Sequence, residues 1–533
     1  MIKGEPLDYS LPEKLNLGAY YLDDNLDLGR GDRTALYCDE RSYSYRELWR
    51  LTNRFGNVLK TLGVEPGNRV LLILEDSAEW AAAWLATMKI GAVGTHAYTY
   101  LAPRDYEYLL ELVRPKVVVL DSATLERVRE GARNSRHPQA FLVAGAGATP
   151  LRQREFSLEK MLESAGGRLD IVPTHRDDLA FWNFSGGTTG QPKGVPHMHR
   201  DGVICFEAWN RVFGYRPDDV IVKVPKLFFH YARDAGFLFA LRSGAAIVLF
   251  RQRSTAALIF ELIRKHRPTV LINVPTMMRS MLQAPQGEHA DLACLRYCIS
   301  SGEMLPAQLH EDWRATFGTE VINRYGSAET GMGMLDNRPG VALPGSSGTV
   351  TPSVEIRLVD AEGREVAQGQ PGTLLARCAS AGRYYERAHE KSMKVFLGDG
   401  WVNTGDVFRQ DTNGYFWHVG RGNDMVKVSG VWVSPLEIED GLQQCPEVKE
   451  CAVLGLEDRD GLVKIKAFVV LAQGAQATSA MQEELRRFCR ERIGPHKIPR
   501  SIEFIPELPK TGAQKIDRRL LRERALWGAE EAI

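Results

Sequence analysis

Residues 181–199, FWNFSGGTTGQPKGVPHMH, combine a strand-like run with a loop rich in glycine and hydroxyl side chains. Backbone amides in such a turn can form an anion nest, and the hydroxyls of Ser185, Thr188 and Thr189 can donate to phosphate oxygens. Lys193 adds a positive charge near the end of the loop. Two residues separate the preceding glycine from this lysine, and no G-x-G-x-x-G follows the strand, which excludes the P-loop and dinucleotide fingerprints. The loop therefore predicts phosphate binding of another class, with a flexible surface loop as the alternative.

Apolar runs that alternate with helical patterns surround this loop. The run RVLLILED at 69–76 precedes a helix-like segment, and further Val/Ile/Leu-rich runs occur at 116–121, 245–250 and 269–274. Short strands that alternate with helices predict a largely parallel α/β sheet. After about Gly340 the pattern changes to alternating segments with glycine and proline, which predicts antiparallel β-structure.

A separate set of strand and helix signals begins near residue 418. Residues 418–442 contain two short strand patterns and then SPLE at 434–437, which is typical of a capped helix start with proline at the first helical position. We expect a domain boundary near residues 421–424. The predicted domains are residues 1–422 and 423–533.

The composition is that of an ordinary globular enzyme. The chain has 533 residues, 44% of them hydrophobic, and 67 basic side chains balance 67 acidic ones. This length predicts at least two domains, and the balanced charge offers no general attraction to nucleic acid or to a membrane surface. The eight cysteines form no CxxC pair, so we expect reduced thiols of a cytoplasmic protein. No secretory leader or long apolar run is found, and neither secretion nor membrane spanning is expected.

The loop resembles the phosphate-loop signature of the adenylate-forming superfamily, which includes acyl- and aryl-CoA ligases, peptide-synthetase adenylation domains and luciferases. Its sequence SGGTTGQPKG is followed, in the family's order, by NRYGSAET (323–330), GWVNTGD (400–406), GRGNDMVKVSG (420–430) and LPKTGAQKIDR (508–518). The resemblance covers nearly the whole chain. It implies an α/β fold, with a large N-terminal domain that carries α/β sheets and a β-barrel, and a small mobile C-terminal α+β domain.

The resemblance implies an ATP site assembled from these motifs. Tyr325 would offer a flat ring to adenine, and Asn323 would bond its amino group. Asp406 would accept hydrogen bonds from both ribose hydroxyls, with Arg421 on the ribose side. The other residues implied for ATP or AMP binding are Ser185, Gly186, Thr188, Thr189, Lys193, Gly302 and Gly326. Taken alone, Tyr325 is more typical of a core aromatic beside a turn, Asp406 of a turn aspartate and Arg421 of a solvated surface charge.

Two residues are implied for catalysis. Glu329 matches the family's magnesium ligand, and a carboxylate suits a Mg²⁺ ion that bridges ATP phosphates. Lys515 matches the lysine that reaches the α-phosphate and neutralises charge on phosphorus as pyrophosphate leaves. The chain departs from the family pattern at Ala328, where threonine is usual, and at 513–514, where Ala-Gln replaces the common Ser/Thr-Gly.

The implied reaction has two steps. A carboxylate attacks the α-phosphorus of ATP, and a thiol then attacks the resulting acyl-adenylate. For the second step the resemblance places Lys427 and Gly430 along a pantetheine tunnel for coenzyme A. It also places a hinge at Asn423, about which the C-terminal domain would turn between the steps, replacing Lys515 by the KVSG strand.

Within the superfamily, the chain resembles benzoate-CoA ligases and their hydroxybenzoate relatives. The likeness rests on residues 33–72, on KLFFHYARDAGFLFAL at 226–241 and on MVKVSGVWVSPLEIE. It implies an aryl-acid pocket formed by His230, Tyr231, Arg233 and Gly326. The polar His230 and Arg233 favour a ring with an amino or hydroxyl group, such as anthranilate. Alternatively, His230 is an aromatic gate and Arg233 faces solvent.

Three functions compete at this stage. The first is an aryl-CoA ligase that uses ATP, Mg²⁺ and coenzyme A. The second is a stand-alone adenylation enzyme that loads an aryl acid onto the phosphopantetheine of an acyl carrier protein. The third is a non-catalytic nucleotide-binding homologue, which the retention of Lys193, Glu329, Asp406, Arg421 and Lys515 disfavours. Whether the chain forms a homodimer is left open.

Overall fold

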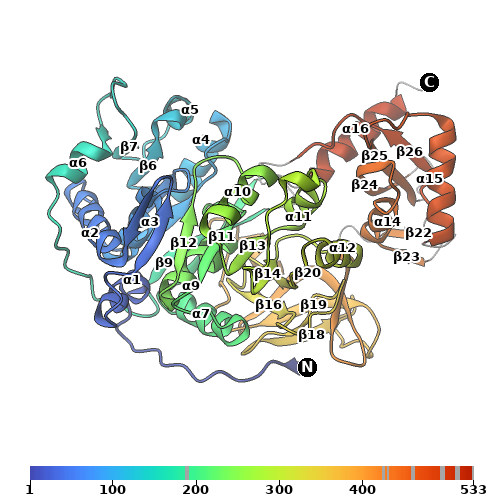
Figure 1. The fold of residues 1–533 in the computed structure, drawn as a ribbon, viewed down its shortest axis with the longest axis horizontal. Coiled ribbons are helices and arrows are strands. Elements are labelled where there is room, and N and C mark those ends of the chain that lie inside the picture. Colours follow the sequence, from blue (N-terminus) through green and yellow to red (C-terminus); the bar gives the residue numbers. More distant parts are fainter. Residues whose placement is uncertain are drawn as a thin grey trace.

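The structure is a computed structural model of the chain. It describes residues 1–186, 191–422, 426–428, 431–457, 463–492, 498–510 and 516–530. The molecule is elongated in Figure 1, where the elements that follow residue 425 form a separate group at one end. This group lies beside α11 (Pro275–Leu282) and α12 (Ala307–Phe317).

A seven-stranded sheet carries the predicted phosphate loop at its edge. Its spatial order is β10 (Pro192–Met198), β9 (Leu179–Gly186), β5 (Val93–His96), β4 (Arg69–Ile73), β6 (Val117–Asp121), β7 (Ala140–Ala144) and β8 (Glu155–Ser157). All neighbours pair in parallel except β9 and β10, which form an antiparallel hairpin. Most residues of β4 and β6 are buried, which agrees with their continuous aliphatic sequences.

A nine-stranded sheet contains the other predicted parallel strands. Its order is β17 (Thr349–Val350), β16 (Gly333–Asp336), β15 (Val321–Gly326), β14 (Tyr297–Ser300), β13 (Val270–Asn273), β11 (Val220–Lys223), β12 (Ala246–Leu249), β2 (Thr34–Cys38) and β3 (Arg41–Ser44). Pairing is parallel from β15 to β2 and antiparallel at both edges. The strands predicted at 69–76, 116–121, 245–250 and 269–274 are confirmed.

The helices that precede residue 425 pack mostly on these two sheets, whereas the last of them contacts the antiparallel sheet. They are α1 (Leu17–Asp27), α2 (Tyr45–Thr61), α3 (Ala78–Lys89), α4 (Pro103–Val113), α5 (Leu125–Gly131), α6 (Leu158–Ser164), α7 (His199–Phe213), α8 (His230–Arg233), α9 (Phe239–Ser243), α10 (Ala256–His266) and α13 (His389–Val395), with α11 and α12. A π-helical turn, Asp234–Leu238, joins α8 to α9.

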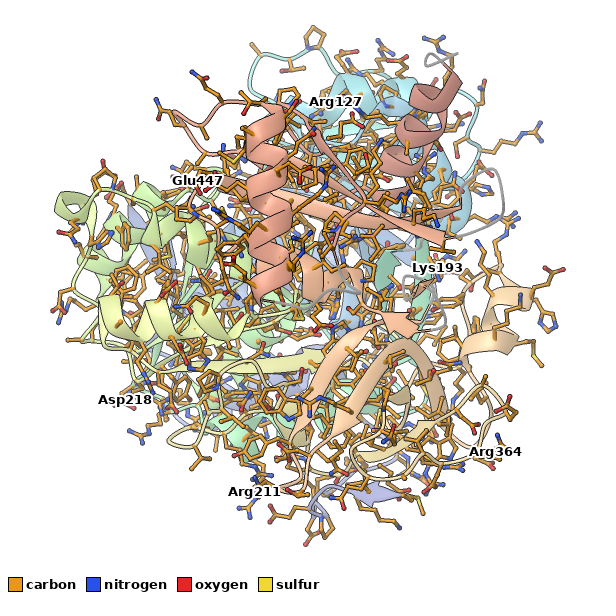
Figure 2. All side chains as sticks on the ribbon, turned by 90° about the vertical axis from the view of Figure 1, so that its right-hand side faces the viewer. Arg127, Lys193, Arg211, Asp218, Arg364 and Glu447 are labelled. Carbon is orange, nitrogen blue, oxygen red and sulfur yellow. The ribbon has the colours of Figure 1, made fainter. Side chains whose placement is uncertain are left out.

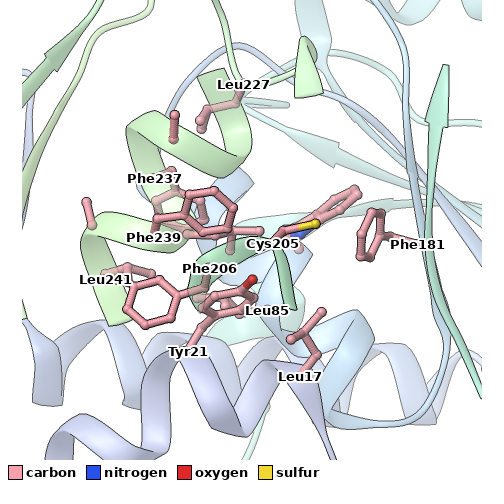
Figure 3. Packing of buried hydrophobic residues seen from close by; sticks show 14 of the residues in the cluster. Leu17, Tyr21, Leu85, Phe181, Cys205, Phe206, Leu227, Phe237, Phe239 and Leu241 are labelled. Carbon is pink, nitrogen blue, oxygen red and sulfur yellow. The ribbon is translucent and has the colours of Figure 1, made fainter. Parts of the chain in front are cut away.

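The main core forms around α3, every residue of which except Glu79 is buried. This helix begins after Ser77, whose side chain accepts a hydrogen bond from the Trp80 amide at 3.1 Å. The Trp80 and Trp84 rings stack at 5.3 Å. Figure 2 views the molecule from the C-terminal end, and Figure 3 shows part of this core, with Phe206 of α7 close to Phe239 and above α1.

A five-stranded antiparallel sheet is formed mostly by residues after 340. Its order is β1 (Ile2–Lys3), β18 (Glu355–Val359), β19 (Gly372–Arg377), β20 (Trp401–Gln410) and β21 (Phe416–Arg421). The prediction of antiparallel β-structure after residue 340 is therefore confirmed.

The elements at the C-terminal end have cores of their own. They are β22 (Val426–Val428), β23 (Val431–Val433), α14 (Pro435–Leu442), β24 (Val448–Glu457), β25 (Val463–Leu471), α15 (Ser479–Arg492), β26 (Ser501–Phe504) and α16 (Arg518–Glu530). Two hydrophobic clusters consist entirely of residues from 433 onward. The predicted cap of α14 is confirmed, because the Ser434 side chain accepts from the Glu437 amide at 3.4 Å. The domain boundary after residue 422 stays a prediction.

Other expectations from composition can be compared directly. All eight cysteines are free, and seven of them are buried. Within the residues that the structure describes, no helix combines the length and apolarity needed to cross a membrane.

Lys223 and Asp76 form an ion pair in the interior, and both side chains are 0% exposed. The other Asp76 oxygen accepts from the Leu227 amide at 2.9 Å, which ties β11 to the segment that leads into α8. We expect Lys223→Met to lower the free energy of unfolding by about 3–5 kcal/mol, because it leaves a buried carboxylate unpaired. The measurement is the urea unfolding midpoint followed by tryptophan fluorescence.

The control is the double variant Lys223→Met/Asp76→Leu, which removes both charges. It should lose less stability than Lys223→Met alone. A double variant that is as unstable as the sum of both single variants would show that the pair is not coupled.

Candidate active site

Ser185 and Lys193 face each other across the β9–β10 hairpin. The antiparallel register pairs these two residues directly, so both side chains start from the base of the predicted phosphate loop. Gly186 ends β9, whereas Thr188 and Thr189 lie outside the described residues. Figure 2 labels Lys193 between the C-terminal elements and the antiparallel sheet.

Lys193 lies in a half-buried environment beside an aromatic ring. Its ammonium is 4.3 Å from the centroid of the Tyr385 ring. Burial lowers the pKa of Lys193, and the positive charges of Lys391 and Arg421 act in the same direction, whereas the carboxylate of Glu329 opposes the change. The site therefore contains a lysine, a carboxylate and an arginine close enough to influence one another.

Tyr385 is a site residue that the sequence did not indicate. Its hydroxyl donates a 2.6 Å hydrogen bond to Glu329 Oε1. Burial and the neighbouring carboxylate of Glu329 raise the pKa of Tyr385. The tyrosine lies between β19 and α13, far along the chain from each partner, and no spacing in the sequence links them.

The ends of β14 and β15 bring the adenine-side residues together. These strands pair in parallel, with Ser300 opposite Asn323, so the turn at Gly302 and the ring of Tyr325 emerge at the same edge of the sheet. This is the carboxyl edge, where open α/β sheets bind their ligands. The parallel register of β14 with β15 thus brings Gly302, Asn323 and Tyr325 together, as predicted.

The Asn323 side chain has an acceptor directed away from its protein partner. Its amide nitrogen donates to the Ser346 carbonyl at 2.9 Å, and the residue is 6% exposed. Its Oδ1 is buried and has no hydrogen-bond partner among the residues that the structure describes. A buried amide oxygen in that state suits a ligand N–H donor, and the exocyclic amino group of adenine is such a donor.

Tyr325, Asp406 and Arg421 form a network that joins two sheets. Asp406 and Arg421 are opposite each other in the β20–β21 register, and Arg421 Nε lies 3.1 Å from Asp406 Oδ1. The Tyr325 hydroxyl, at the end of β15, donates to the other carboxylate oxygen. His418 adds a third contact, 3.6 Å from Oδ1. His418 was not predicted, because only the register of β20 with β21 brings it near Asp406.

The network keeps Asp406 ionised. Burial alone would raise its pKa, but the nearby His418 ring and the charge of Arg421 outweigh this effect and lower the pKa below its usual value of 3.8. Burial and the neighbouring carboxylate raise the pKa of Tyr325 well above its usual value. An ionised carboxylate accepts hydrogen bonds only, and a ribose diol can supply two donors.

Two glycines of the site are closely surrounded by other groups. A Cβ on Gly326 would lie 2.7 Å from the Met332 carbonyl oxygen. Gly302 has a φ of +88°, which favours glycine, and a Cβ there would lie 3.3 Å from the Phe229 ring. Because Phe229 precedes α8, this contact places the predicted acid-binding helix beside the adenine-side turn.

The predicted acid-pocket residues on α8 differ in burial. His230, at the start of α8, is half-buried, with its ring 5.2 Å from that of Phe229. Tyr231 is buried, and its hydroxyl donates to the Ile299 carbonyl on β14 at 3.0 Å. Burial raises the pKa of Tyr231 well above its usual value. Contact of either side chain with an aryl acid stays a prediction.

The Arg233 side chain is fully buried, so the alternative that it faces solvent is wrong. Its guanidinium donates to Asp234 Oδ1 and to Asn183 Oδ1, both at 2.8 Å. It lies 4.7 Å from the centroids of both the Trp84 and Phe181 rings. Burial raises the pKa of Asp234 despite this ion pair. Arg233 therefore supports α8 from the core, and its proposed contact with the acid is untested.

The donor set fits a nucleotide-borne metal ion. In the described parts of the chain, no three His, Cys, Asp or Glu side chains form a cluster that could hold an ion. Mg²⁺ is commonly held by one or two carboxylates together with substrate phosphates and water. The single carboxylate of Glu329, beside Lys193 and the phosphate hairpin, is of this kind.

Several predicted residues lie outside the described residues or have undescribed side chains. Lys515, Asn423 and Gly430 are outside, and the side chain of Lys427 on β22 is not described. Their assigned roles stay predictions.

Comparisons with known proteins agree along the whole chain. Residues 27–385 match the AMP-binding enzyme family, and residues 437–515 match the AMP-binding enzyme C-terminal domain. A 4-hydroxybenzoate–CoA/benzoate–CoA ligase of Rhodopseudomonas palustris is 38% identical over 97% of this chain and 95% of its own length. The benzoate–CoA ligase of Thauera aromatica is 36% identical, with 97% of each chain covered.

Solved structures of similar proteins share the fold. An anthranilate CoA ligase in complex with anthranoyl-AMP superposes with a TM-score of 0.92 at 36% identity, covering 98% of this chain and 99% of the other. A benzoate CoA ligase from Burkholderia xenovorans LB400 has a TM-score of 0.85 at 34% identity, with 95% and 99% covered.

We expect Asp406→Ala to raise the KM for ATP by about a hundredfold or more. The substitution removes both proposed ribose contacts, and hydrogen bonds to charged groups contribute about 1.5–3 kcal/mol each. Because the folded pKa of Asp406 is below its usual 3.8, its contribution is full above that value and is lost only as the pH falls through the lower folded pKa. The measurement is pyrophosphate release as ATP is varied from pH 5 to 8.

Asp411→Ala is the matched control. Asp411 lies in the same hairpin, where it accepts from the Trp417 indole at 2.9 Å and has no assigned ligand. Its variant should keep the KM for ATP. Equal increases in both variants would count against the assignment of Asp406.

Proposed function

The chain belongs to the AMP-binding enzyme family, and we propose that it is an ATP-dependent aryl-CoA ligase. It would activate a benzoate-type acid as aryl-AMP and transfer the aryl group to coenzyme A. The observation that carries this proposal is the meeting of α8 with the ends of β14 and β15. There the Phe229 ring lies close to Gly302, so that a side chain at Gly302 would meet it, next to the buried acceptor of Asn323.

The first step would need no protein nucleophile. Asn323 and Tyr325 hold adenine, while Asp406 holds the ribose, so the α-phosphorus is presented to the acid carboxylate in a fixed direction. Lys193 and Ser185 meet the phosphates. Mg²⁺, bound to ATP and held by Glu329, would neutralise phosphate charge. Lys515 would stabilise the charge that develops on phosphorus while pyrophosphate leaves.

The second step would use the other face of the C-terminal domain. We propose that this domain turns about Asn423, which withdraws Lys515 and brings Lys427 and Gly430 to the adenylate. The thiol of coenzyme A would then attack the carbonyl and expel AMP. Two conformations allow one cleft to serve both chemistries.

The substrate class is proposed from the relatives and from α8. The relatives are named for benzoate and hydroxybenzoates, and the similar solved structure holds anthranoyl-AMP. His230 is half-buried at the start of α8 and can offer a hydrogen bond to a ring substituent. We therefore propose benzoate or an amino- or hydroxybenzoate, such as anthranilate, as the acid.

We expect small aromatic acids to be adenylated in preference to aliphatic ones. The assay is pyrophosphate release with benzoate, its amino and hydroxy derivatives, phenylacetate, cinnamate and hexanoate. Thioester formation with coenzyme A, compared with an acyl carrier protein, then identifies the acceptor. A clear preference for hexanoate would refute the aryl assignment, and dependence on a carrier protein would favour the loading enzyme.

We expect the two half-reactions to depend on different residues. Lys515→Ala should nearly abolish adenylate formation yet still convert supplied aryl-adenylate to thioester. Gly430→Leu should do the reverse, because its side chain would fill the space of the pantetheine arm. Asn423→Pro should impair thioester formation more than adenylation, since proline restricts φ at the hinge.

Each half-reaction is assayed separately, with Lys510→Ala as the control. Lys510 is a nearby lysine that pairs with Glu450 at 3.0 Å. Its variant should keep both activities. Equal losses of both steps in Lys515→Ala and Gly430→Leu would contradict the two-conformation scheme.

A further inference from the structure

Tyr385 is held rigidly in the interior. Its side chain is 3% exposed and packs in one cluster with Val195 and Ala328. Its ring meets that of Phe396 edge-on at 5.2 Å. The Tyr385 amide donates to Ser392 Oγ at 2.9 Å, which fixes the backbone to α13. Such a side chain keeps one direction, whatever its polar neighbours do.

The two ends of this side chain contact groups of opposite charge. The hydroxyl donates to Glu329 Oε1 at 2.6 Å, and the ring lies 4.3 Å below the Lys193 ammonium. A hydrogen bond to a carboxylate and a cation over an aromatic face are both favourable, and more so away from bulk water. Tyr385 thus gives each charged group a favourable contact, and the two groups do not need to pair with each other.

Without Tyr385, Glu329 and Lys193 would attract each other directly. They interact electrostatically in the structure, yet no ion pair between them within 4.0 Å occurs in the described part of the chain. In a half-buried site, a direct pair would be stronger than at the surface. A direct pair would occupy the Glu329 carboxylate, which we propose binds Mg²⁺. It would also occupy the Lys193 ammonium, which we propose binds phosphate.

The backbone around Glu329 is fixed independently. The Gly382 amide donates to the Glu329 carbonyl at 2.7 Å, and His197 Nε2 lies 2.9 Å from the Ala328 carbonyl oxygen. The backbone around Glu329 therefore has anchors that do not involve the Tyr385 hydroxyl. The tyrosine hydroxyl acts on the direction of the carboxylate alone.

We propose that Tyr385 is a positioning residue for nucleotide binding. Its hydroxyl orients Glu329 and its ring holds Lys193, so that these side chains do not neutralise each other before ATP and Mg²⁺ bind. This inference rests on the proposed function of the site as an ATP site, but it is independent of which acid is activated.

The test measures equilibrium binding of a non-hydrolysable ATP analogue, with and without Mg²⁺ and with no acid present. Tyr385→Phe keeps the ring and loses the hydroxyl. It should weaken binding in Mg²⁺ about tenfold, equivalent to about 1.4 kcal/mol, with a smaller change without metal. Tyr385→Leu also loses the ring under Lys193 and should weaken binding in both conditions.

Tyr384→Phe is the matched control, because this neighbouring tyrosine is 41% exposed and has no assigned role. It should bind the analogue as the parent protein does. Since no acid is used, a wrong substrate class would leave these results unchanged. Failure of every protein, including the parent, to bind the analogue would instead refute the proposed ATP site, and the inference with it.

A double-mutant cycle separates positioning from a general structural role. If Tyr385 acts through Glu329, adding Tyr385→Phe to Glu329→Gln should cause little further loss of Mg²⁺-dependent binding. Additive losses would overturn the proposal, as would Mg²⁺-dependent binding that Tyr385→Phe leaves unchanged. A Tyr385→Phe protein that fails to fold would also overturn it, because the hydroxyl would then serve stability and not the site.

Discussion

The hydrogen bond from Tyr325 to Asp406 is the constraint on which the site depends, because it links the ends of two sheets that share one core. Tyr325 ends a strand of the nine-stranded sheet, whereas Asp406 belongs to the antiparallel sheet, where it also pairs with Arg421. The bond sets the distance between the proposed adenine-side and ribose-side groups. A nucleotide that spans this junction would meet donors and acceptors already in place, which reduces the entropy cost of ordering them on binding.

The structure also determines how charged side chains are paired in the partly buried site. Asp406 is ionised by its contacts with His418 and Arg421, and Tyr385 lies between Glu329 and Lys193. Deeper in the core, Arg233 donates to Asp234 and to Asn183. Each of these charged side chains thus has a protein partner. The partner does not use all of the side chain's hydrogen-bonding positions, so some are left for a ligand or for a neighbouring strand. Removing one member of such a pair affects more than its own contact, since the remaining charge stays buried.

The fold was predicted well where the signal is local. Aliphatic runs between helical patterns predicted the parallel strands, and SPLE at 434–437 predicted the start of α14, because periodicity and capping act over a few residues. The residues of the ordered motifs were also predicted, and the structure brings together Lys193, Glu329, Asp406 and Arg421. The burial of Arg233 was not predicted, because its neighbours Trp84 and Phe181 come from elements far away in sequence. Tyr385 and His418 were missed for the same reason.

By itself, then, the sequence determined the strands, the helix starts and the chemical types of the groups that a nucleotide needs. Only the tertiary structure decided how those groups are combined. The register of β14 with β15 sets Ser300 beside Asn323, and that of β20 with β21 sets Asp406 opposite Arg421. The same packing inserts Tyr385 between Lys193 and Glu329. The physical reason is that hydrogen bonds and cation–π contacts act over a few ångströms in space, and residues far apart in the chain reach that range only when their strands pair and their helices pack.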